Sequence, residues 1–213
     1  MAQPHQQFYT VQEYLWEEQH SEEKHEYLKG HVYNMAGGSP EHSQIAFNLA
    51  AGLKRELRSK GCRAFNSDLK VGMVSPPLST GKRRRNKGPG EDSFITYPDT
   101  SVVCGELEFF EGDRNTLANP IVLFEVVSPS TRNYDRSVKL ENYQTISSLL
   151  YYVMIDSEQV KVIYYQRSDL ESWLQPAPLL SRDESLSLVL PAGTITLTVA
   201  ELYDEIVFED EEE

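Results

Sequence analysis

The chain has 213 residues, enough for one well-cored domain but few for two, so we expect a single domain over residues 1–207. Hydrophobic residues make up 39% of the chain and charged residues 25%, which excludes a largely disordered protein, and no apolar run is long enough to cross a bilayer. The net charge of −13 excludes a uniformly basic surface for nucleic acid. Part of this charge lies at the C-terminus, where we expect residues 208–213 to form an acidic, disordered tail.

The N-terminal third of the chain carries the signals of a helix, a hairpin and a second, longer helix. Thr10 and Glu13 have the spacing of a capping box, which predicts that a short helix follows. Residues 24–36 alternate in polarity around a glycine, which is typical of a hairpin. The longer helix should begin at Pro40 and end before Gly61, since proline favours the first helical position and glycine the residue after the end. Its apolar residues recur at helical spacing and should face the core: Ile45, Leu49, Leu53 and Leu57.

Two short strands and a long loop come next. We expect the strands over residues 62–66 and 69–74, and the loop over residues 75–93, which are rich in Pro, Gly, Ser and Arg. Cys62 and Cys104 are isolated, with no CxxC pair that would indicate a zinc site. We interpret both as free thiols, which together with the lack of a signal peptide in MAQPHQQFYT predicts a cytoplasmic protein.

The C-terminal half begins with the most apolar segment of the chain. Residues 121–127 form a continuous apolar run interrupted only by Glu125, which predicts a strand buried on both faces. The elements expected after it are a helix over residues 133–146, strands over 149–155 and 160–166, weaker strands over 170–200 and a closing helix over 199–207. Together the elements predict a mixed α/β fold.

Glu125 is the strongest single indication of chemistry in the sequence. A carboxylate inside a buried strand is costly unless an opposite charge compensates it, and a divalent cation is the simplest partner; a strand end that meets solvent or an arginine is the alternative. Asp99 lies 26 positions earlier, at the start of another apolar strand. Neighbouring strands lie about 5 Å apart, so the two carboxylates could share one cation. Hard oxygen ligands of this kind favour Mg²⁺ or Mn²⁺.

Lys139 lies on the helix expected directly after the Glu125 strand. Asp135, Lys139 and Tyr143 follow each other at intervals of four residues and should share one face of that helix. The lysine could reach the metal site, where it would orient or deprotonate a water, with Asp135 and Tyr143 as supporting residues. The alternative is an exposed helix with an ordinary ion pair between Asp135 and Lys139.

Two further residues and one basic segment complete the candidate site. Glu26 could supply a third acidic metal ligand, and His42 lies near a helix N-terminus, where it could face phosphate. A lone histidine at such a place is more often an ordinary surface residue. Arg83, Arg84 and Arg85 could bind phosphate, although a basic loop is as often only solvated.

Several segments together resemble a known family. The matching segments are EYLKG (26–30), GSPEHS (38–43), YPD (97–99), FEVVSPST (124–131), and Asp135 with Lys139 and Tyr143. They span about residues 10–165 and are similar to the Uma-type restriction endonuclease family of the PD-(D/E)xK nuclease superfamily. The resemblance implies a restriction endonuclease-like core, with a central mixed β-sheet flanked by α-helices.

The resemblance also implies roles for individual residues. It carries metal-ligand roles onto Asp99 and Glu125 and a further acidic role onto Glu26. The superfamily pattern usually has a lysine two positions after the second acid, where this chain has Val127. The lysine role is then expected to pass to Lys139 on the next helix.

We therefore expect an endonuclease that depends on Mg²⁺ or Mn²⁺ and hydrolyses phosphodiester bonds of DNA, as a homodimer if it cuts both strands. Three alternatives stay open at this point. The first is a catalytically silent module that binds nucleic acid on the same fold. The second is a hydrolase with a carboxylate pair, such as a glycosidase, which would leave Lys139 without a role. The third is an oligomeric structural protein that uses the apolar segment 149–154 as an interface.

Overall fold

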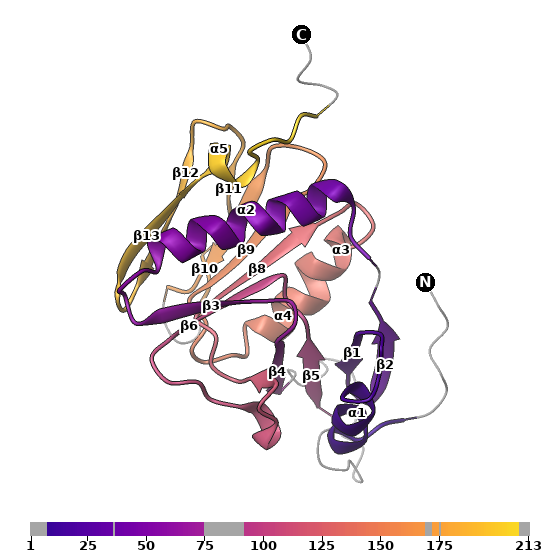
Figure 1. The fold of residues 1–213 in the computed structure, drawn as a ribbon. Helices are drawn as coiled ribbons and strands as arrows, with labels where there is room; N and C mark the ends of the chain where they lie inside the picture. The colour runs from indigo at the N-terminus through magenta and orange to yellow at the C-terminus, as the bar shows by residue number, and fades with distance from the viewer. Residues whose placement is uncertain (1–7, 36, 75–91, 169–171, 175, 209–213) are drawn as a thin grey trace.

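The computed structural model describes residues 8–35, 37–74, 92–168, 172–174 and 176–208. Within them the strands form a five-stranded sheet, a six-stranded sheet and a two-stranded hairpin (Figure 1). The helical elements are α1 (Val11–Glu18), α2 (Pro40–Glu56), α3 (Arg132–Tyr134), α4 (Leu140–Tyr143) and α5 (Val199–Leu202), with a 3₁₀ turn η1 (Phe110–Gly112) and a π-helical turn η2 (Asp135–Lys139). The mixed α/β fold expected from the sequence is confirmed.

The five-stranded sheet grows from the predicted N-terminal hairpin. Its strands are β1 (His25–Leu28), β2 (His31–Asn34), β4 (Lys70–Val74), β5 (Ser93–Thr96) and β7 (Thr116–Leu117), in the order β2-β1-β5-β4-β7. Helix α1 begins at Thr10, whose side chain and that of Glu13 make both hydrogen bonds of the capping box. The predicted first helix and hairpin are therefore confirmed.

The six-stranded sheet holds the strand that contains Glu125. Its strands are β3 (Cys62–Asn66), β6 (Thr100–Cys104), β8 (Val122–Val127), β9 (Tyr151–Asp156), β10 (Val162–Gln166) and β11 (Ala177–Leu179), in the order β11-β10-β9-β8-β6-β3. Strand β8 pairs antiparallel with β6 and parallel with β9, and all of its residues are buried, as predicted. Strand β9 is also buried throughout, so the segment considered as an interface belongs to the core.

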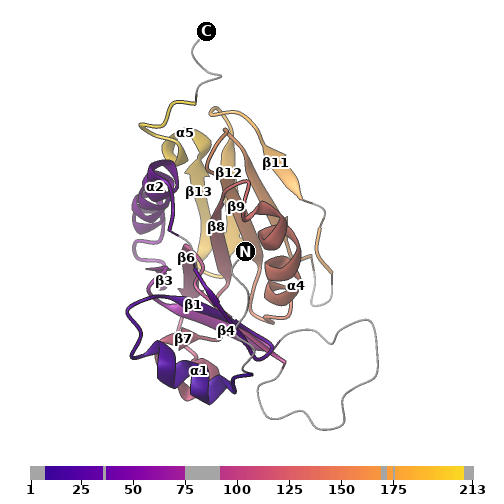
Figure 2. The ribbon, with the colours of Figure 1, turned by 90° about the vertical axis from the view of Figure 1, so that its right-hand side faces the viewer.

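Helices cover both faces of the six-stranded sheet. Figure 2 shows α2 on one side of β8 and β9 and α4 on the other. The residues of β8 alternate between the two cores, as a pleated strand requires. Val122, Phe124 and Val126 pack in the core that contains the buried face of α2, and Leu123 and Val127 pack in the core on the α4 side. Glu125 therefore projects to the side of η2 and α4.

The C-terminal hairpin closes the core over α2. Strands β12 (Ser185–Leu190) and β13 (Gly193–Thr198) pair antiparallel, and β12 alternates exposed and buried residues. The predicted weaker strands are confirmed, but the closing helix is shorter than predicted because α5 ends at Leu202. Tyr203 then leaves the helix with its hydroxyl donating to the Asp156 carbonyl oxygen at 2.9 Å, which holds the chain in the core.

The helix predicted over residues 133–146 is also different in the structure. The chain is helical from Arg132 to Tyr143, but its central turn, η2, is a π-helix rather than an α-helix. Side-chain periodicity does not reveal such a turn, because the residues before and after it still face the sheet. Single π-turns inside α-helices occur frequently at functional sites.

The prediction of two free thiols is wrong. Cys62 and Cys104 are cross-strand partners on β3 and β6 and are joined by a disulfide. This pairing could not be predicted from the spacing of the cysteines, because it depends on the register of two strands that are far apart in the chain. A disulfide is uncommon in a reducing compartment, so the cytoplasmic location stays a prediction. No helix in the described part of the chain has both the length and the apolar character needed to cross a bilayer.

Candidate active site

The centre of the site is a contact between β8 and the helical segment that follows it. The Glu125 side chain is only 6% exposed, and its Oε1 atom accepts hydrogen bonds from Lys139 Nζ at 2.9 Å and from the Tyr143 hydroxyl at 2.6 Å. Both donors come from the helix directly after the strand. The lysine thus reaches back over the sheet to the carboxylate instead of pointing into solvent.

A second carboxylate comes from the other sheet. Glu26 on β1 lies with an oxygen 3.3 Å from Lys139 Nζ, and it is buried. The Thr96 hydroxyl donates to Oε1 of Glu26, and the Tyr134 hydroxyl donates to Oε2 at 3.1 Å. These two hydrogen bonds hold the Glu26 carboxylate in place. Its ion pair with Lys139 in turn holds the ammonium group between the two sheets.

Among the residues that the structure describes, Lys139 is the only cation paired with three buried carboxylates. Asp135, one turn earlier, lies 3.5 Å from the same Nζ atom, in addition to Glu125 and Glu26. Their attraction together outweighs burial, so the pKa of Lys139 is raised well above its usual value. The raised pKa favours the protonated amine, in which form Lys139 is a hydrogen-bond donor and a positive charge.

The three carboxylates carry more negative charge than the single Lys139 ammonium can neutralise, so the charge of Glu125 is only partly compensated. Burial raises the pKa of Glu125 to about 8, against the lowering effect of Lys139. The nearby charges of Asp99 and Asp135 raise this pKa further. A carboxylate in this situation is stabilised by a proton or by an additional cation.

Asp99 lies beside Glu125 across the strand pair. Thr100 on β6 faces Phe124 on β8, so extending this antiparallel register by one residue places Asp99 opposite Glu125. Oδ2 of Asp99 accepts the Val126 N–H at 2.7 Å. Asp99 directly precedes β6, and its charge acts on Glu125, so the two carboxylates that the sequence singled out lie near each other at the end of the strand pair.

His42 holds the other oxygen of Asp99. Its Nε2 atom lies 3.0 Å from Asp99 Oδ1, and this hydrogen bond raises the pKa of His42 while partial burial opposes the rise. Gly38 leaves room for the ring, because a Cβ atom on residue 38 would lie 2.8 Å from His42 Cδ2. The start of α2 thus positions His42 against Asp99.

The donor atoms at this place suit a hydrated hard cation rather than a metal enclosed by protein. Asp99 and Glu125 supply carboxylate oxygens on adjacent strands, and the cluster has more buried negative charge than Lys139 compensates. Among the described residues, no group of three or more His, Cys, Asp or Glu side chains is placed to hold a metal ion. Mg²⁺ commonly binds through one or two carboxylates and keeps several waters, so two ligands are sufficient.

The comparisons with known proteins agree with this architecture. The model of the Uma2 family, described as "Putative restriction endonuclease", matches residues 10–200, most of the chain. This chain belongs to the Uma2 family. Family membership supports a nuclease-like function for the Uma2 chain.

Two relatives of the Uma2 chain come from Synechocystis sp. and are described as uncharacterized. The protein slr1290 is 30% identical over 199 residues, which cover 93% of each chain. The protein sll1609 is 29% identical over 165 residues, which cover 78% of this chain and 84% of the relative. Both matches cover most of the Uma2 chain.

A solved structure shares the fold of the Uma2 chain. It comes from Anabaena variabilis and is described as "a putative nuclease belonging to DUF820". The TM-score is 0.61 with 18% sequence identity, and the match covers 91% of this chain and 97% of that one. The restriction endonuclease-like fold class expected from the sequence is thus confirmed.

Two residues of the Uma2 site escaped the sequence analysis. Thr96 and Tyr134 both bind Glu26, and neither belongs to a segment that stood out by spacing or charge. A polar residue within the apolar strand Ser93–Thr96 is the one available signal, since a buried hydroxyl needs a partner. The predicted phosphate-binding residues Arg83, Arg84 and Arg85 lie outside the residues that the structure describes.

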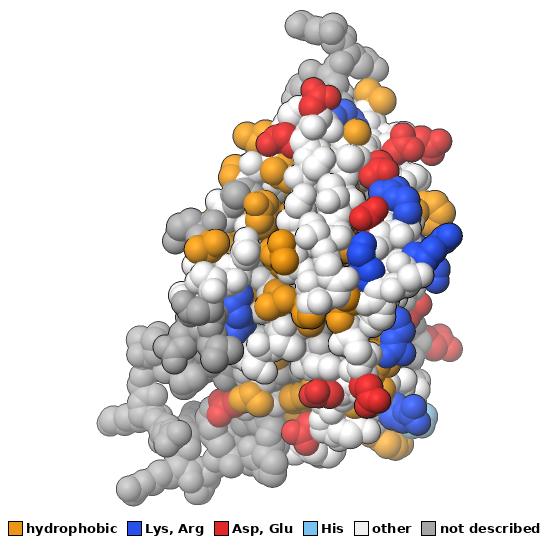
Figure 3. Space-filling model, turned by 90° about the vertical axis from the view of Figure 1, so that its left-hand side faces the viewer, with side chains coloured by type: hydrophobic (Ala, Val, Ile, Leu, Met, Phe, Trp, Pro, Cys, Tyr) orange, Lys and Arg blue, Asp and Glu red, His pale blue; other side chains and the backbone are white. Residues whose placement is uncertain are grey.

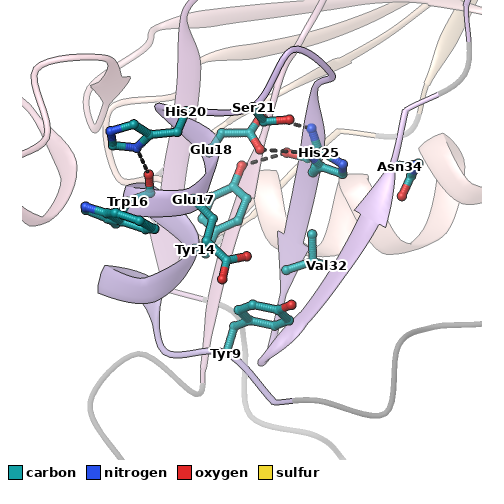
Figure 4. Close-up of a pocket in the computed structure, with 10 residues that line it drawn as sticks. All are labelled: Tyr9, Tyr14, Trp16, Glu17, Glu18, His20, Ser21, His25, Val32 and Asn34. Atoms are coloured by element: carbon teal, nitrogen blue, oxygen red, sulfur yellow. Dashed lines mark hydrogen bonds and ion pairs between the residues drawn. The ribbon is translucent and has the colours of Figure 1, made fainter.

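A separate pocket on the Uma2 chain lies between α1 and the β1–β2 hairpin (Figure 4). There Glu18 accepts hydrogen bonds from the His25 backbone N–H at 2.9 Å and from the Tyr97 hydroxyl at 2.6 Å, and it pairs with the His25 ring at 2.9 Å. None of the carboxylates around Lys139 lines this pocket. Its contribution to the site is indirect, since the Tyr97 contact anchors the segment that leads to Asp99.

Proposed function

We propose that the chain is a metal-dependent nuclease that hydrolyses phosphodiester bonds of DNA. Asp99 and Glu125 are the proposed ligands of Mg²⁺ or Mn²⁺, and Lys139 positions the attacking water. The observation that carries the proposal is the buried Lys139 ammonium on Glu125, with Asp99 next to it across the strand pair. Glu26 was expected as a third ligand; its contacts favour holding Lys139 instead.

The chemistry divides between the cation and the chain. A bound divalent cation would polarise the phosphate and lower the pKa of a coordinated water. The Lys139 ammonium, oriented by Glu26 and Glu125, donates hydrogen bonds to the attacking water and to a phosphate oxygen, where charge accumulates in the transition state. The water oxygen bonds to phosphorus and its proton passes to solvent, the bond from phosphorus to the leaving deoxyribose oxygen breaks, and the leaving oxygen receives a proton from solvent.

Supporting residues fix the carboxylates for this reaction. The Tyr143 hydroxyl remains a donor to Glu125, because burial raises the pKa of Tyr143 well above its usual value. His42 and the Val126 N–H orient Asp99. Tyr143 and His42 therefore act as positioning residues, and Asp135 adds a further contact to Lys139.

The test is a cleavage assay with supercoiled plasmid and with end-labelled single-stranded DNA, in Mg²⁺, in Mn²⁺ and in EDTA. We expect cleavage only with metal, and a loss of at least ~100-fold for Asp99→Asn, Glu125→Gln and Lys139→Gln, the size seen when one transition-state donor is removed. Glu141→Gln is the matched control, since Glu141 lies on α4 with its side chain exposed. Circular dichroism of each variant verifies that it is folded.

Cleavage that persists in Asp99→Asn and Glu125→Gln, or that needs no metal, contradicts the proposal. DNA binding with a steep salt dependence and no cleavage by the wild type would instead support the silent binding module. The homodimer also remains a proposal, to be tested by sedimentation of the wild type with and without duplex DNA.

A further inference from the structure

A groove of about 780 Å³ opens directly beside the candidate active site. It runs between the N-terminal half of α2 and β3, and Asp99 and His42 line one part of it. Small side chains, among them Ala46, Ala50 and Ala64, leave it wide. Its volume is in the range of pockets that hold a small organic ligand. Asp99 lines this groove and is also a proposed metal ligand of the active site. A molecule bound in the groove would therefore lie next to the reacting phosphate of the proposed reaction.

One exposed aromatic ring lines the groove. Phe47 on α2 is 71% exposed, although the apolar residues of the same helix that face the core are fully buried. Phe65 on β3 also borders the groove, but it packs against the core on the α4 side of the sheet, so it offers no second ring there. An exposed phenyl ring beside an active site offers a flat apolar face, and nucleic-acid bases stack on such faces irrespective of their sequence.

Basic side chains continue the groove away from the carboxylates. On α2 the face of Phe47 and Ala50 continues at helical spacing to Lys54, and Arg58 follows just beyond the end of the helix. Both are exposed, and neither forms an ion pair within the described part of the chain. Exposed Arg63 lies at the start of β3. Figure 3, which views the molecule from the left-hand side of Figure 1, shows Lys and Arg side chains along its right-hand side, with Asp and Glu side chains among them.

We propose that this groove binds an unpaired nucleotide adjacent to the scissile phosphate, with its base on Phe47. The phosphates that follow lie toward Lys54, about 10 Å along α2 from Phe47 at the rise of an α-helix, and toward Arg58 just beyond the end of the helix. A base in a duplex presents only its edges to the grooves, and its faces are covered by stacking, so an aromatic platform selects unpaired bases. The substrate class is then single-stranded DNA, or a duplex with an extruded nucleotide. This inference rests on the proposed nuclease function.

The experiment measures binding of the full chain to an oligonucleotide that carries one 2-aminopurine, whose fluorescence falls on stacking. Titrations are made in Ca²⁺ and in EDTA, with the single strand and with its duplex. We expect at least tenfold tighter binding of the single strand, and for Phe47→Ala about tenfold weaker binding with loss of the fluorescence change. Phe47→Trp should retain both, and Val189→Ala, an exposed apolar residue on β12, should match the wild type.

Equal affinity for single strand and duplex, or an unchanged signal in Phe47→Ala, overturns the inference. The inference is also overturned if the wild type is a dimer and Phe47→Ala converts it to monomers without weakening DNA binding. Phe47 would then be a contact between two copies of the chain. Cleavage by the wild type with no effect of Phe47→Ala rejects this inference alone. Stacking and binding without any metal-dependent cleavage reject the proposed hydrolysis and leave the groove as a binding site.

Discussion

At the scale of single residues, the account depends on how the chain tolerates Glu125 inside a buried strand. A buried carboxylate without a partner is costly, and this consideration alone identified Glu125 in the sequence. The structure gives it Lys139 and Tyr143 as donors, but it also places Glu26 and Asp135 around the same ammonium. Without a further cation, the negative charge of these carboxylates is therefore only partly neutralised. This charge favours metal binding, but it lowers the stability of the metal-free fold.

This condition predicts a pH dependence of stability in the metal-free protein. Burial raises the pKa of Glu125 from 4.5 to about 8, so the folded state binds this proton more tightly than the unfolded state. The stabilisation is fully present below pH 4.5 and is lost as the pH rises through 8. We expect the free energy of unfolding to fall between pH 5 and 8, on the order of a few kcal/mol.

Urea unfolding in EDTA at several pH values checks this prediction for the wild type and for Glu125→Gln. The variant cannot titrate at this position, so its stability should change clearly less over the same range. Glu141→Gln should keep the wild-type slope because Glu141 is exposed. Equal slopes for the wild type and Glu125→Gln would show that Glu125 titrates normally and that its burial is compensated.

At the scale of secondary-structure elements, local sequence patterns predicted most helices and strands, but not where a helix ends or changes its type. The α2 periodicity and the capping box of Thr10 and Glu13 depend only on neighbours in the sequence, and both are present in the structure. The π-turn η2 was missed because it keeps Asp135 and Lys139 on the face that an α-helix also gives them. The short α5 was missed because a tertiary contact of Tyr203 ends the helix.

The close packing of α2 on β13 gives a prediction at this scale. A Cβ atom on residue 52 would lie 2.8 Å from Leu197 Cδ2, so Gly52→Ala requires the buried Leu197 side chain to shift. Alanine favours a helix interior over glycine by about 1 kcal/mol, whereas overpacking a core costs about 1–3 kcal/mol. We expect a net loss of stability of about 1 kcal/mol in urea unfolding. Exposed Ala51→Gly tests the opposite change without this contact, and a more stable Gly52→Ala would show that Leu197 moves aside at little cost.

At the scale of the whole molecule, the relations between distant segments were the least predictable. The resemblance indicated which acids belong together, and the register of β6 and β8 explains why Asp99 and Glu125 meet. The pairing of Cys62 with Cys104 and the anchoring of Glu26 by Thr96 and Tyr134 depend on strand register and on sheet packing. Such non-local contacts leave no mark in the spacing of the sequence.

The disulfide gives a prediction for the molecule as a whole. Cys62 and Cys104 are 42 residues apart, and the bond between them restricts the unfolded chain. We expect reduction with dithiothreitol to lower the free energy of unfolding by about 2–4 kcal/mol. The Cys62→Ser, Cys104→Ser double variant should be insensitive to the reductant. A thiol titration that finds two free cysteines in the untreated folded protein would contradict the bond.

The most direct test of the central claim is the position of a divalent cation in crystals of the protein soaked with Mn²⁺. The account predicts an anomalous peak in contact with carboxylate oxygens of Asp99 and Glu125, with Lys139 close by, and no such peak in crystals of Glu125→Gln. A peak bound elsewhere, or no peak beside Asp99 at a saturating concentration of Mn²⁺, would contradict it.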